Sequence, residues 1–450
     1  MKKLTIAYVG LSKASWKTPE ICTLMQTALK SLKKLPVEII HSDDLTVTEA
    51  EALELCDKFS KKNIDALVLH FTSFPVGSII PAIAQRTNVP IVLFANPEEA
   101  GAEGRWERNS FCGANMAAHI LYKLGRRYDF VWESSENAAE AIAPFMKTLN
   151  CVAALADMRL GLVGGRVPGF YTSNFDEMKL RAAFGLAIEV IDLLEVINTA
   201  ENISKSEEAD GIEKLRKSAS GICRVTEREL ALAGNLYQAF IRVANKYALN
   251  GYAVRCWPEL SDIYGIAPCA VIGMLNDSGL TVSCEGDILG AVTMAIQKHL
   301  SGGSVPFFVD LISFDYKENT GVVWHCGAAP VSLCRSFDET ALCRHMRVDG
   351  GDKKGVTNEF SLRAGRVTFA KLDETAAGYR MLIASGTALD TDKFIRGNPL
   401  KIKFDGDVKK LIDIIVKKGF EHHYSVVHAD IKNELVAFCE FMNIEVIVID

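Results

Sequence analysis

The sequence predicts an α/β fold: two Rossmann-like parallel-sheet α/β domains, followed by a C-terminal, mainly antiparallel β domain with flanking helices. Over the first two thirds of the chain, continuous apolar strand-like runs alternate with helix-like segments, as in parallel sheets covered by helices on both faces. Past Gly302-Gly303, strand-like runs follow one another without helices between them. The length of 450 residues suffices for two to four domains with large cores. We expect domains at residues 1–156, 157–303 and 304–450.

The first predicted domain alternates strands and helices from its start. Its expected strands are Leu4–Val9, Val37–Ile40, Ala66–His70 and Ile91–Ala95, and its expected helices are Pro19–Leu35, Thr48–Lys62 and 77–86. Neither G-x-G-x-x-G nor G-x-x-x-x-G-K-[ST] follows a strand, so we expect no bound dinucleotide. The long loop Pro97–Asn115 carries Arg105 and Trp106. Such a loop is either a solvated connection or a segment that covers substrate or contacts another subunit.

The second predicted domain opens with a strand, Leu160–Val163, and a glycine-rich loop that contains Arg166. Because glycine allows close backbone approach, Arg166 either lines a pocket or pairs with an acidic neighbour. The segments expected next are helix Glu177–Phe184, strand Ala187–Leu193, an exposed helix at 200–220, helix Val225–Tyr247, strand Ala253–Cys256, a helix ending at Met274 and a strand starting at Thr281.

The third predicted domain is rich in strands. They are expected at 306–315, 320–326, 357–362, 366–372 and 379–385, followed by helix Gly406–Lys418, a strand opened by His422-His423, a helix at 430–442 and strand Glu445–Ile449. The helix before this domain is expected at Ile288–Leu300.

Three ionisable residues, Glu285, Asp310 and His325, lie at the end of or inside apolar strands. Charge in apolar sequence is costly unless it is paired or bound to a metal. If Asp315 pairs with Thr320 across a four-residue loop, Asp310 lies directly opposite His325. Their Cβ atoms would then be about 4.5–5.5 Å apart, close enough for one ion to bridge them. Taken alone, a histidine in such a strand is more often a satisfied core residue.

Glu421-His422-His423 opens another apolar strand and could complete this group. Two carboxylates with one or two imidazoles form an oxygen and nitrogen donor set without thiolate. That set favours Mn²⁺ or a similar divalent ion over structural zinc. Cys284, Trp324 and Cys326 are neighbours of the candidate ligands and are expected to point to the opposite faces of their strands as packing residues.

Composition excludes several classes of partner. The net charge is −6 without a basic cluster, which argues against nucleic acid, and no apolar run reaches the length of a membrane span. The N-terminal sequence predicts a strand rather than a cleavable signal peptide. The 12 cysteines form no C-x-x-C pair and read as reduced thiols, so we expect a cytoplasmic protein.

The segment Glu285-Gly286-Asp287, between a strand and a helix, resembles the glutamate segment of the L-arabinose isomerases. Asp310 and His325 are similar to that family's second acid and first histidine, and His422-His423 resembles its C-terminal histidine segment. L-fucose isomerases have a related arrangement, with aspartate as the second acid. Because this chain is shorter than either enzyme, it resembles a compact, fucose isomerase-like branch of the L-fucose/L-arabinose isomerase superfamily.

The resemblance implies a metal-dependent aldose–ketose isomerase that acts on a fucose- or arabinose-like sugar or a substituted hexose through a cis-enediol. It implies that Glu285, Asp310 and His423 hold Mn²⁺ or another divalent cation, with His325 as a further ligand. His422 would contact substrate or water. Glu285 and Asp310 suit the acid/base pair, because two carboxylates flanking C1 and C2 can exchange the proton between them.

Three further residues are candidates for substrate binding: Trp106 by stacking on sugar, and Arg105 and Arg166 by charge. The resemblance also implies a homo-oligomer, often a hexamer, in which Trp106 reaches a neighbouring subunit. Two other functions remain open at this point: a non-catalytic sugar-binding or sensor protein, and a metal-dependent sugar epimerase or aldolase on the same scaffold. The identity of the sugar is not predicted.

Overall fold

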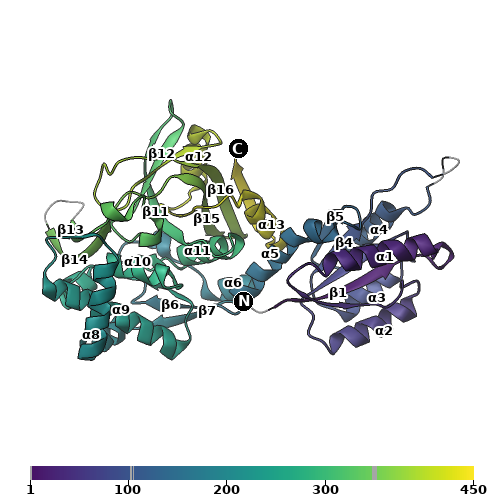
Figure 1. Ribbon diagram of the computed structural model, residues 1–450, viewed down its shortest axis with the longest axis horizontal. Coiled ribbons are helices and arrows are strands. Elements are labelled where there is room, and N and C mark those ends of the chain that lie inside the picture. Colours follow the sequence, from purple (N-terminus) through teal and green to yellow (C-terminus); the bar gives the residue numbers. More distant parts are fainter. Residues whose placement is uncertain (1–2, 102–103, 105, 347–351) are drawn as a thin grey trace. The chain divides into compact units, whose positions relative to one another are not determined.

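The computed structural model describes residues 3–101, 104, 106–346 and 352–450, which form two compact units, Met1–Asn150 and Cys151–Asp450 (Figure 1). The predicted fold class is confirmed, because two of the sheets are parallel and the large C-terminal sheet is mainly antiparallel. The predicted domain boundaries after residues 156 and 303 stay predictions. Among the described residues, no helix combines the length and apolarity needed to cross a membrane.

The N-terminal unit is built on a parallel sheet with the strand order β2-β1-β3-β4-β5. Its elements are β1 (Thr5–Leu11), α1 (Pro19–Leu32), β2 (Glu38–His41), α2 (Glu49–Ser60), β3 (Ala66–Phe71), α3 (Ile79–Arg86), β4 (Ile91–Ala95), α4 (Ser110–Lys123), β5 (Tyr128–Trp132) and the start of α5 (Ala138–Ala156). Helices α2, α3 and α4 pack on one face, against alternate residues of β1 and β3 such as Val9 and Leu69. Helix α1 covers the other face, where Tyr8 donates a hydrogen bond to the carbonyl of Met25.

The predicted loop Pro97–Asn115 is shorter than expected, because α4 already begins at Ser110. Gly113 contributed to the prediction of a loop, but it lies inside the helix. A Cβ at this position would come within 2.7 Å of Pro75 Cδ, so glycine serves close packing here rather than a turn. Strand β5 and helix α5 were not predicted.

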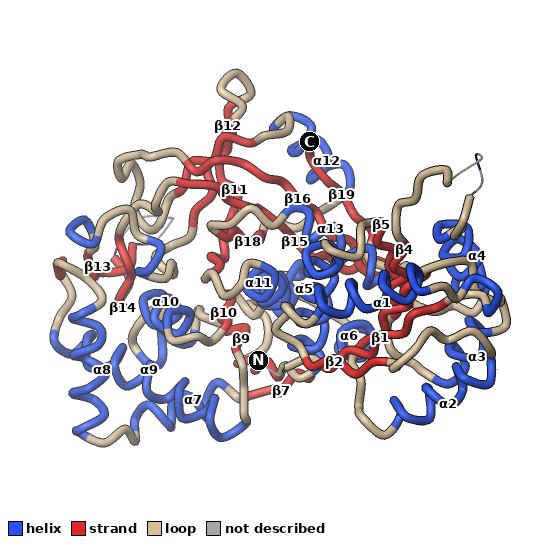
Figure 2. The backbone as a smooth tube through the Cα atoms, turned by 45° about the vertical axis from the view of Figure 1, so that its right-hand side comes forward, coloured by secondary structure: helices blue, strands red, loops and turns tan. Residues whose placement is uncertain are grey.

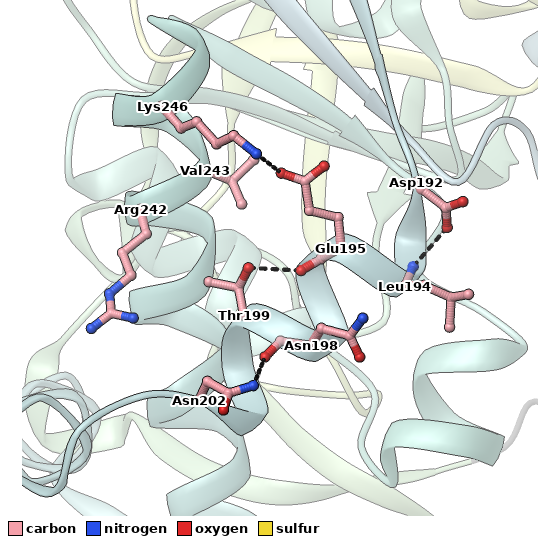
Figure 3. Close-up of a pocket in the computed structure, with 9 residues that line it drawn as sticks. All are labelled: Asp192, Leu194, Glu195, Asn198, Thr199, Asn202, Arg242, Val243 and Lys246. Atoms are coloured by element: carbon pink, nitrogen blue, oxygen red, sulfur yellow. Dashed lines mark hydrogen bonds and ion pairs between the residues drawn. The ribbon is translucent and has the colours of Figure 1, made fainter.

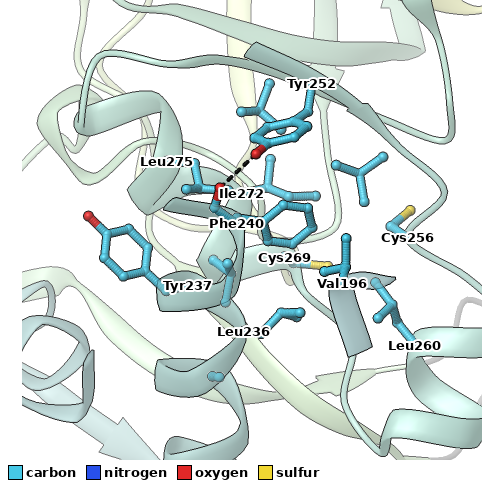
Figure 4. Close-up of a cluster of buried hydrophobic side chains, with 14 of the residues drawn as sticks. Val196, Leu236, Tyr237, Phe240, Tyr252, Cys256, Leu260, Cys269, Ile272 and Leu275 are labelled. Atoms are coloured by element: carbon cyan, nitrogen blue, oxygen red, sulfur yellow. Dashed lines mark hydrogen bonds between the residues drawn. The ribbon is translucent and has the colours of Figure 1, made fainter. Parts of the chain in front are cut away.

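The second unit begins with a parallel sheet in the order β10-β9-β6-β7. Its elements are β6 (Arg159–Val163), α6 (Glu177–Phe184), β7 (Ala187–Ile191), α7 (Leu193–Glu201), α8 (Lys205–Lys217), α9 (Glu227–Tyr247), β9 (Gly251–Val254), α10 (Cys269–Asp277), β10 (Thr281–Cys284) and α11 (Ile288–Leu300). A capping box between Thr226 and Glu229 starts α9. Its apolar face packs into the cluster of Figure 4, in which the Tyr252 hydroxyl donates to the carbonyl of Phe240 at 2.6 Å.

The C-terminal strands close into a barrel (Figure 2). Its strands are β11 (Pro306–Asp315), β12 (Thr320–Trp324), β15 (Gly365–Thr375), β16 (Gly378–Ala388), β17 (Leu400–Phe404) and β18 (His423–Val427). Closure follows because β15 pairs with both β16 and β18. The remaining elements are α12 (Val408–Lys418), α13 (Lys432–Met442), β19 (Glu445–Ile449), and a small sheet of β8 (Gly221–Cys223), β13 (Ala341–Met346) and β14 (Asp352–Glu359).

Helix α11 lies between the parallel sheet and the barrel and contacts strands of both. Its residues from Ile288 to Gln297 are all buried, which explains its continuous apolar sequence. The turn that leads into α11 therefore lies where sheet and barrel meet, and that turn carries Glu285. The short strands β8, β13 and β17 were not predicted.

Candidate active site

The turn Glu285-Gly286-Asp287 connects β10 to α11. Glu285 has a φ of 62°, in the left-handed region that side chains other than glycine rarely adopt. A Cβ on Gly286 would lie 2.4 Å from the carbonyl oxygen of Gly165, so the glycine-rich loop after β6 packs directly on this turn. Asp287 caps α11 by accepting a hydrogen bond from the Gly290 amide at 2.8 Å. The cap fixes the turn, and the turn fixes the direction of Glu285.

His423, the first residue of β18, is fully buried and lies between two of these acids. Its Nε2 is 2.7 Å from Glu285 Oε2, and its Nδ1 is 3.2 Å from Asp287 Oδ2. Asp310 lies directly opposite on β11, with Oδ1 3.9 Å from His423 Nε2. One imidazole is thus held by carboxylates that lie more than a hundred residues away from it in the sequence.

Lys371 forms ion pairs with two carboxylates beside His423, those of Asp287 and Glu421. It is 1% exposed and lies 3.2 Å from Asp287 Oδ2. Glu421 Oε2 accepts a hydrogen bond from the His423 amide at 3.0 Å. A buried lysine is stable only when it is paired, so Lys371 and the two carboxylates stabilise one another.

The predicted pairing of Asp310 with His325 is wrong. Asp315 does pair with Thr320 as expected, but a β-bulge at Ile312 adds one residue to β11, and Asp310 consequently lies opposite Trp324. A shift of one residue exchanges the faces of a strand. The bulge therefore brings Trp324, which was expected to point away as core, to the face that carries Asp310.

Asp310 and His325 nevertheless line the same cavity of about 480 Å³, together with Glu285. The other lining residues are Phe170, Cys256, Trp257, Ser261, Ala267, Pro268, Cys269, Trp324, Cys326 and His345. Asp310 Oδ1 is buried and has no hydrogen-bond partner within the described part of the chain. A buried carboxylate oxygen without a partner is costly, and it marks the place where a ligand or ion would bind.

The carboxylates and the histidine shift one another's pKa in opposite directions. Burial raises the pKa of Glu285, but its hydrogen bond with His423 and the charge of His325 outweigh burial and lower the pKa to about 2. Burial lowers the pKa of His423, yet its hydrogen bonds to Asp287 and Glu285 raise it to about 9. The acidic surroundings of His423 thus favour a positive charge at neutral pH.

His422 belongs to the same group of donors: one atom each from Glu285, His422 and His423 lie within 4.8 Å of one another. Its side chain is 48% exposed, in contrast to buried His423. Burial and the charge of His423 lower the pKa of His422. Both histidines of the predicted pair therefore face the Glu285 carboxylate, one from the interior and one from the solvent side.

The remaining predicted residues lie elsewhere. The Arg166 guanidinium lies over the ring of Tyr171, 4.9 Å from its centroid, and Arg166 is not among the residues that line the cavity. Trp106 belongs to the N-terminal unit, where 57% of its surface is exposed. Arg105 lies outside the described residues. The roles of these residues in substrate binding stay predictions.

Two aromatic residues of the cavity were missed by the sequence analysis. Trp257 donates from Nε1 to Glu285 Oε1 at 3.0 Å, and the Phe170 ring stands edge-on to Trp257 at 5.5 Å. A signal for Trp257 was available: it follows β9, the parallel neighbour of β10, and the carboxyl ends of such strands meet at one edge. Phe170 follows the glycine-rich loop that packs on Gly286.

A second hollow of about 590 Å³ lies between α7 and α9 (Figure 3). Its charged groups are already engaged. Lys246 pairs with Glu195 at 2.9 Å, and Asp192 accepts a hydrogen bond from the Leu194 amide at the start of α7. Because these contacts are internal, we assign no site to this hollow.

Known proteins resemble the chain along its whole length. The model of the fucose/sulfoquinovose isomerase N-terminal domain matches residues 14–156, and that of the L-fucose isomerase C-terminal domain matches residues 323–450. A sulfoquinovose isomerase of Alkalicoccus urumqiensis is 29% identical over 457 residues, covering 99% of this chain and 100% of that protein. One from Priestia aryabhattai is 26% identical over 449 residues, covering 99% of each.

Among solved structures, an ABC transporter periplasmic solute-binding protein from Actinobacillus succinogenes with bound D-allose is 12% identical. The alignment covers 66% of this chain and 92% of that one, with a TM-score of 0.18. This score is too low to support an argument about fold or function.

Proposed function

Because the chain belongs to the fucose isomerase-like superfamily and is an aldose–ketose isomerase, we propose that it interconverts the aldose and ketose forms of a sulfonated hexose at a divalent metal ion. The observation that carries the proposal is the convergence of Glu285, Asp310 and His423 from three separate elements beside one cavity. The sulfonated substrate is proposed because the curated relatives are sulfoquinovose isomerases.

The donor set fits a divalent ion such as Mn²⁺. It consists of carboxylate oxygens and imidazole nitrogens, and the unpartnered Asp310 Oδ1 points to a missing neighbour. Asp287 accepts from His423 Nδ1, which leaves Nε2 on the side of Glu285 and Asp310. A carboxylate behind a metal-binding histidine commonly fixes the ring in this way, and it favours His423 over His422 as ligand. His325 is kept as a further ligand because it lines the same cavity.

Glu285 and Asp310 are proposed to move the proton between C1 and C2 of the sugar, through a cis-enediol. Glu285 is ionised at neutral pH, so it can accept a proton, and the Trp257 indole holds its Oε1 in place. Asp310 approaches from the barrel side of the cavity. The ion, when bound, would polarise the two sugar oxygens as a Lewis acid. His422 is proposed to contact the sugar from the solvent side.

The assay that tests this function uses protein stripped with a chelator and then supplied with Mn²⁺. Sulfoquinovose, glucose, fucose and arabinose are offered separately, and the product is identified by NMR, which distinguishes a ketose from an epimeric aldose. We expect ketose from the sulfonated sugar, only with metal present. Turnover without metal, or an epimer as the product, would contradict the proposal.

Glu285→Gln keeps the size of the side chain and removes its basicity. We expect turnover to fall by about 10²- to 10⁴-fold, the usual contribution of a general acid or base. Glu318→Gln, in the exposed loop of the β11–β12 hairpin, is the matched control and should retain wild-type turnover. Melting curves of both variants establish that the fold is kept, and an active Glu285→Gln protein would refute the role.

Assembly as a homo-oligomer, a hexamer included, remains part of the proposal, together with contacts of Trp106 and Arg105 to the sugar. Sedimentation velocity determines the oligomeric state. Trp106→Ala should raise KM for the sugar and leave the melting temperature unchanged, because the side chain is exposed within its unit. An unchanged KM would remove Trp106 from the site.

A further inference from the structure

A second group of metal-ligating side chains lies in the wall of the same cavity. It consists of Cys269, the first residue of α10, Cys326, two residues after β12, and His345 on β13. One donor atom from each of the three lies within 4.8 Å of the others. The proposed isomerisation uses none of them, since it needs carboxylates and imidazoles beside the sugar carbons.

The spacing of the two thiols suits a tetrahedral ion. Cys269 Sγ and Cys326 Sγ are 3.7 Å apart. Two thiolates bound to tetrahedral zinc at about 2.3 Å would lie about 3.8 Å apart. The thiols therefore already have the separation of zinc ligands, and little movement is needed for an ion to contact both.

His345 supplies an independent sign of a missing neighbour. The residue is 9% exposed, and its Nδ1 has no hydrogen-bond partner among the described residues. A buried ring nitrogen without a partner loses the hydrogen bond that it had with water. An ion held jointly with the two thiols would compensate for this loss.

We propose that Cys269, Cys326 and His345 form a binding site for a soft divalent cation, and that Zn²⁺ is the ion these three ligands suit. Three protein ligands leave the fourth tetrahedral position open to the cavity. Thiolate donors select Zn²⁺ over Mn²⁺, whereas the oxygen and nitrogen donors around Glu285 suit Mn²⁺. The cavity would thus hold two cation sites of different chemistry.

Occupation of this site should inhibit turnover, a consequence that rests on the proposed function. Cys326 Sγ is 3.5 Å from His325 Nδ1, so an ion on Cys326 would place positive charge beside a histidine of the proposed active site. The ion would also occupy part of the space that the sugar needs. Binding itself does not depend on the substrate or on catalysis.

Co²⁺ titration of the reduced, metal-free full-length protein tests the site. Binding to thiolate produces a near-ultraviolet charge-transfer band that carboxylate and imidazole ligands do not give, and Zn²⁺ should then displace Co²⁺ and abolish the band. Binding should be weakened at least about tenfold in each of three variants, Cys326→Ser, Cys269→Ser and His345→Gln. Even residues that only hydrogen-bond to a metal ligand lower metal affinity by that factor when they are replaced. Cys256→Ser, a thiol of the same cavity outside the trio, is the matched control and should keep the band.

Absence of the band in wild-type protein, or an undiminished band in both serine variants, would overturn the site. If the melting curve shows that one of the three variants does not fold, the other two variants determine whether the site exists. Glu285→Gln should retain the band even though it is expected to be inactive. The band is therefore informative even if no sugar is turned over.

Inhibition is measured with Zn²⁺ added against an excess of Mn²⁺. Wild-type turnover should fall, and Cys269→Ser should need at least about tenfold more Zn²⁺ for the same loss, in line with its weaker binding. Equal sensitivity of the two proteins would overturn the inhibitory role and leave the binding site to be judged by the Co²⁺ band.

Discussion

His70 in the N-terminal unit and His423 in the second unit are both fully buried on strands, yet their surroundings are opposite. The ring of His70 lies between two neutral groups, the Tyr8 hydroxyl and Asn96 Oδ1, each at 2.6 Å. His423 lies between Glu285 and Asp287. Burial lowers the pKa of His70 to about 4, whereas the two carboxylates raise that of His423 to about 9.

The comparison shows that the partners of a buried histidine decide whether its ring is charged. Burial alone disfavours the charged ring in both places. Neutral partners leave that cost in place at His70, while carboxylates compensate for it at His423. The charge of the partners, rather than the depth of burial, separates the two.

The largest expected difference between the two histidines is in catalysis. His423→Gln should lower turnover by about 10²-fold or more, because the proposed acid/base and metal groups lose their shared partner. His70→Gln should leave turnover at the wild-type value. Steady-state rates measured with Mn²⁺ in excess provide the check. If both variants are equally active, the distinction between the two histidines fails.

Removal of Lys371 tests whether the acids around His423 depend on a buried cation. Lys371→Met leaves Asp287 and Glu421 without it, and breaking a buried ion pair typically costs about 3–5 kcal/mol. Lys417→Met breaks the pair with Asp413 on the surface of α12 and should cost less than about 1 kcal/mol. Urea unfolding of both variants measures the difference. Equal stability would mean that the buried pair contributes no more than the surface pair.

Acid should destabilise the protein through His70. Its pKa is about 4 in the folded chain and 6.5 as a reference value, so the unfolded chain takes up the proton first as the pH falls. The free energy of unfolding should therefore decrease between about pH 6.5 and pH 4, by on the order of 3 kcal/mol for a fully buried group. When the free energy of unfolding is plotted against pH across this window, the slope should be smaller for His70→Gln than for the wild-type protein. An identical slope in both proteins would contradict the assignment.

His423 should show the opposite pH dependence in metal-free protein. Its folded pKa is raised, so its stabilising contribution is complete below pH 6.5 and is lost as the pH rises through about 9. Histidine NMR signals assigned by substitution separate the two residues, because His70 should remain neutral at pH 6 while His423 remains protonated.

The smallest effect concerns a neutral partner. Tyr8→Phe leaves Nδ1 of His70 without its hydrogen bond and should cost about 1–3 kcal/mol of stability, with turnover unchanged. Tyr122→Phe, on an exposed side chain of α4, is the matched control and should change neither. A stability loss equal in both variants would show that the buried bond contributes little.

Sequence periodicity predicted some elements to the residue, although it missed α5, a helix of 19 residues. The bounds of α11 (Ile288–Leu300), β11 (Pro306–Asp315) and β19 (Glu445–Ile449) coincide with expectation. Local signals suffice for these elements, since Asp287 caps the helix and alternation or a continuous apolar run marks the strands. Short strands such as β8 carry too few residues for a period to be recognised.

Register and long-range pairing were beyond the sequence signals. The bulge at Ile312 leaves no mark in the alternation, yet it decides whether Trp324 or His325 faces Asp310. Lys371 could have been noticed, because it interrupts an apolar strand just as Asp310 does. Its pairing with Asp287, 84 residues away, depends on how the barrel packs on α11.

The left-handed backbone of Glu285 has a consequence for protein engineering. A side chain held in that region costs on the order of 1–3 kcal/mol, which glycine would avoid. Libraries screened for heat tolerance alone should therefore enrich glycine at this position, and the proposed catalytic carboxylate would be lost. Thermostable variants of this chain are best evolved under a screen that reads out sugar conversion in every round.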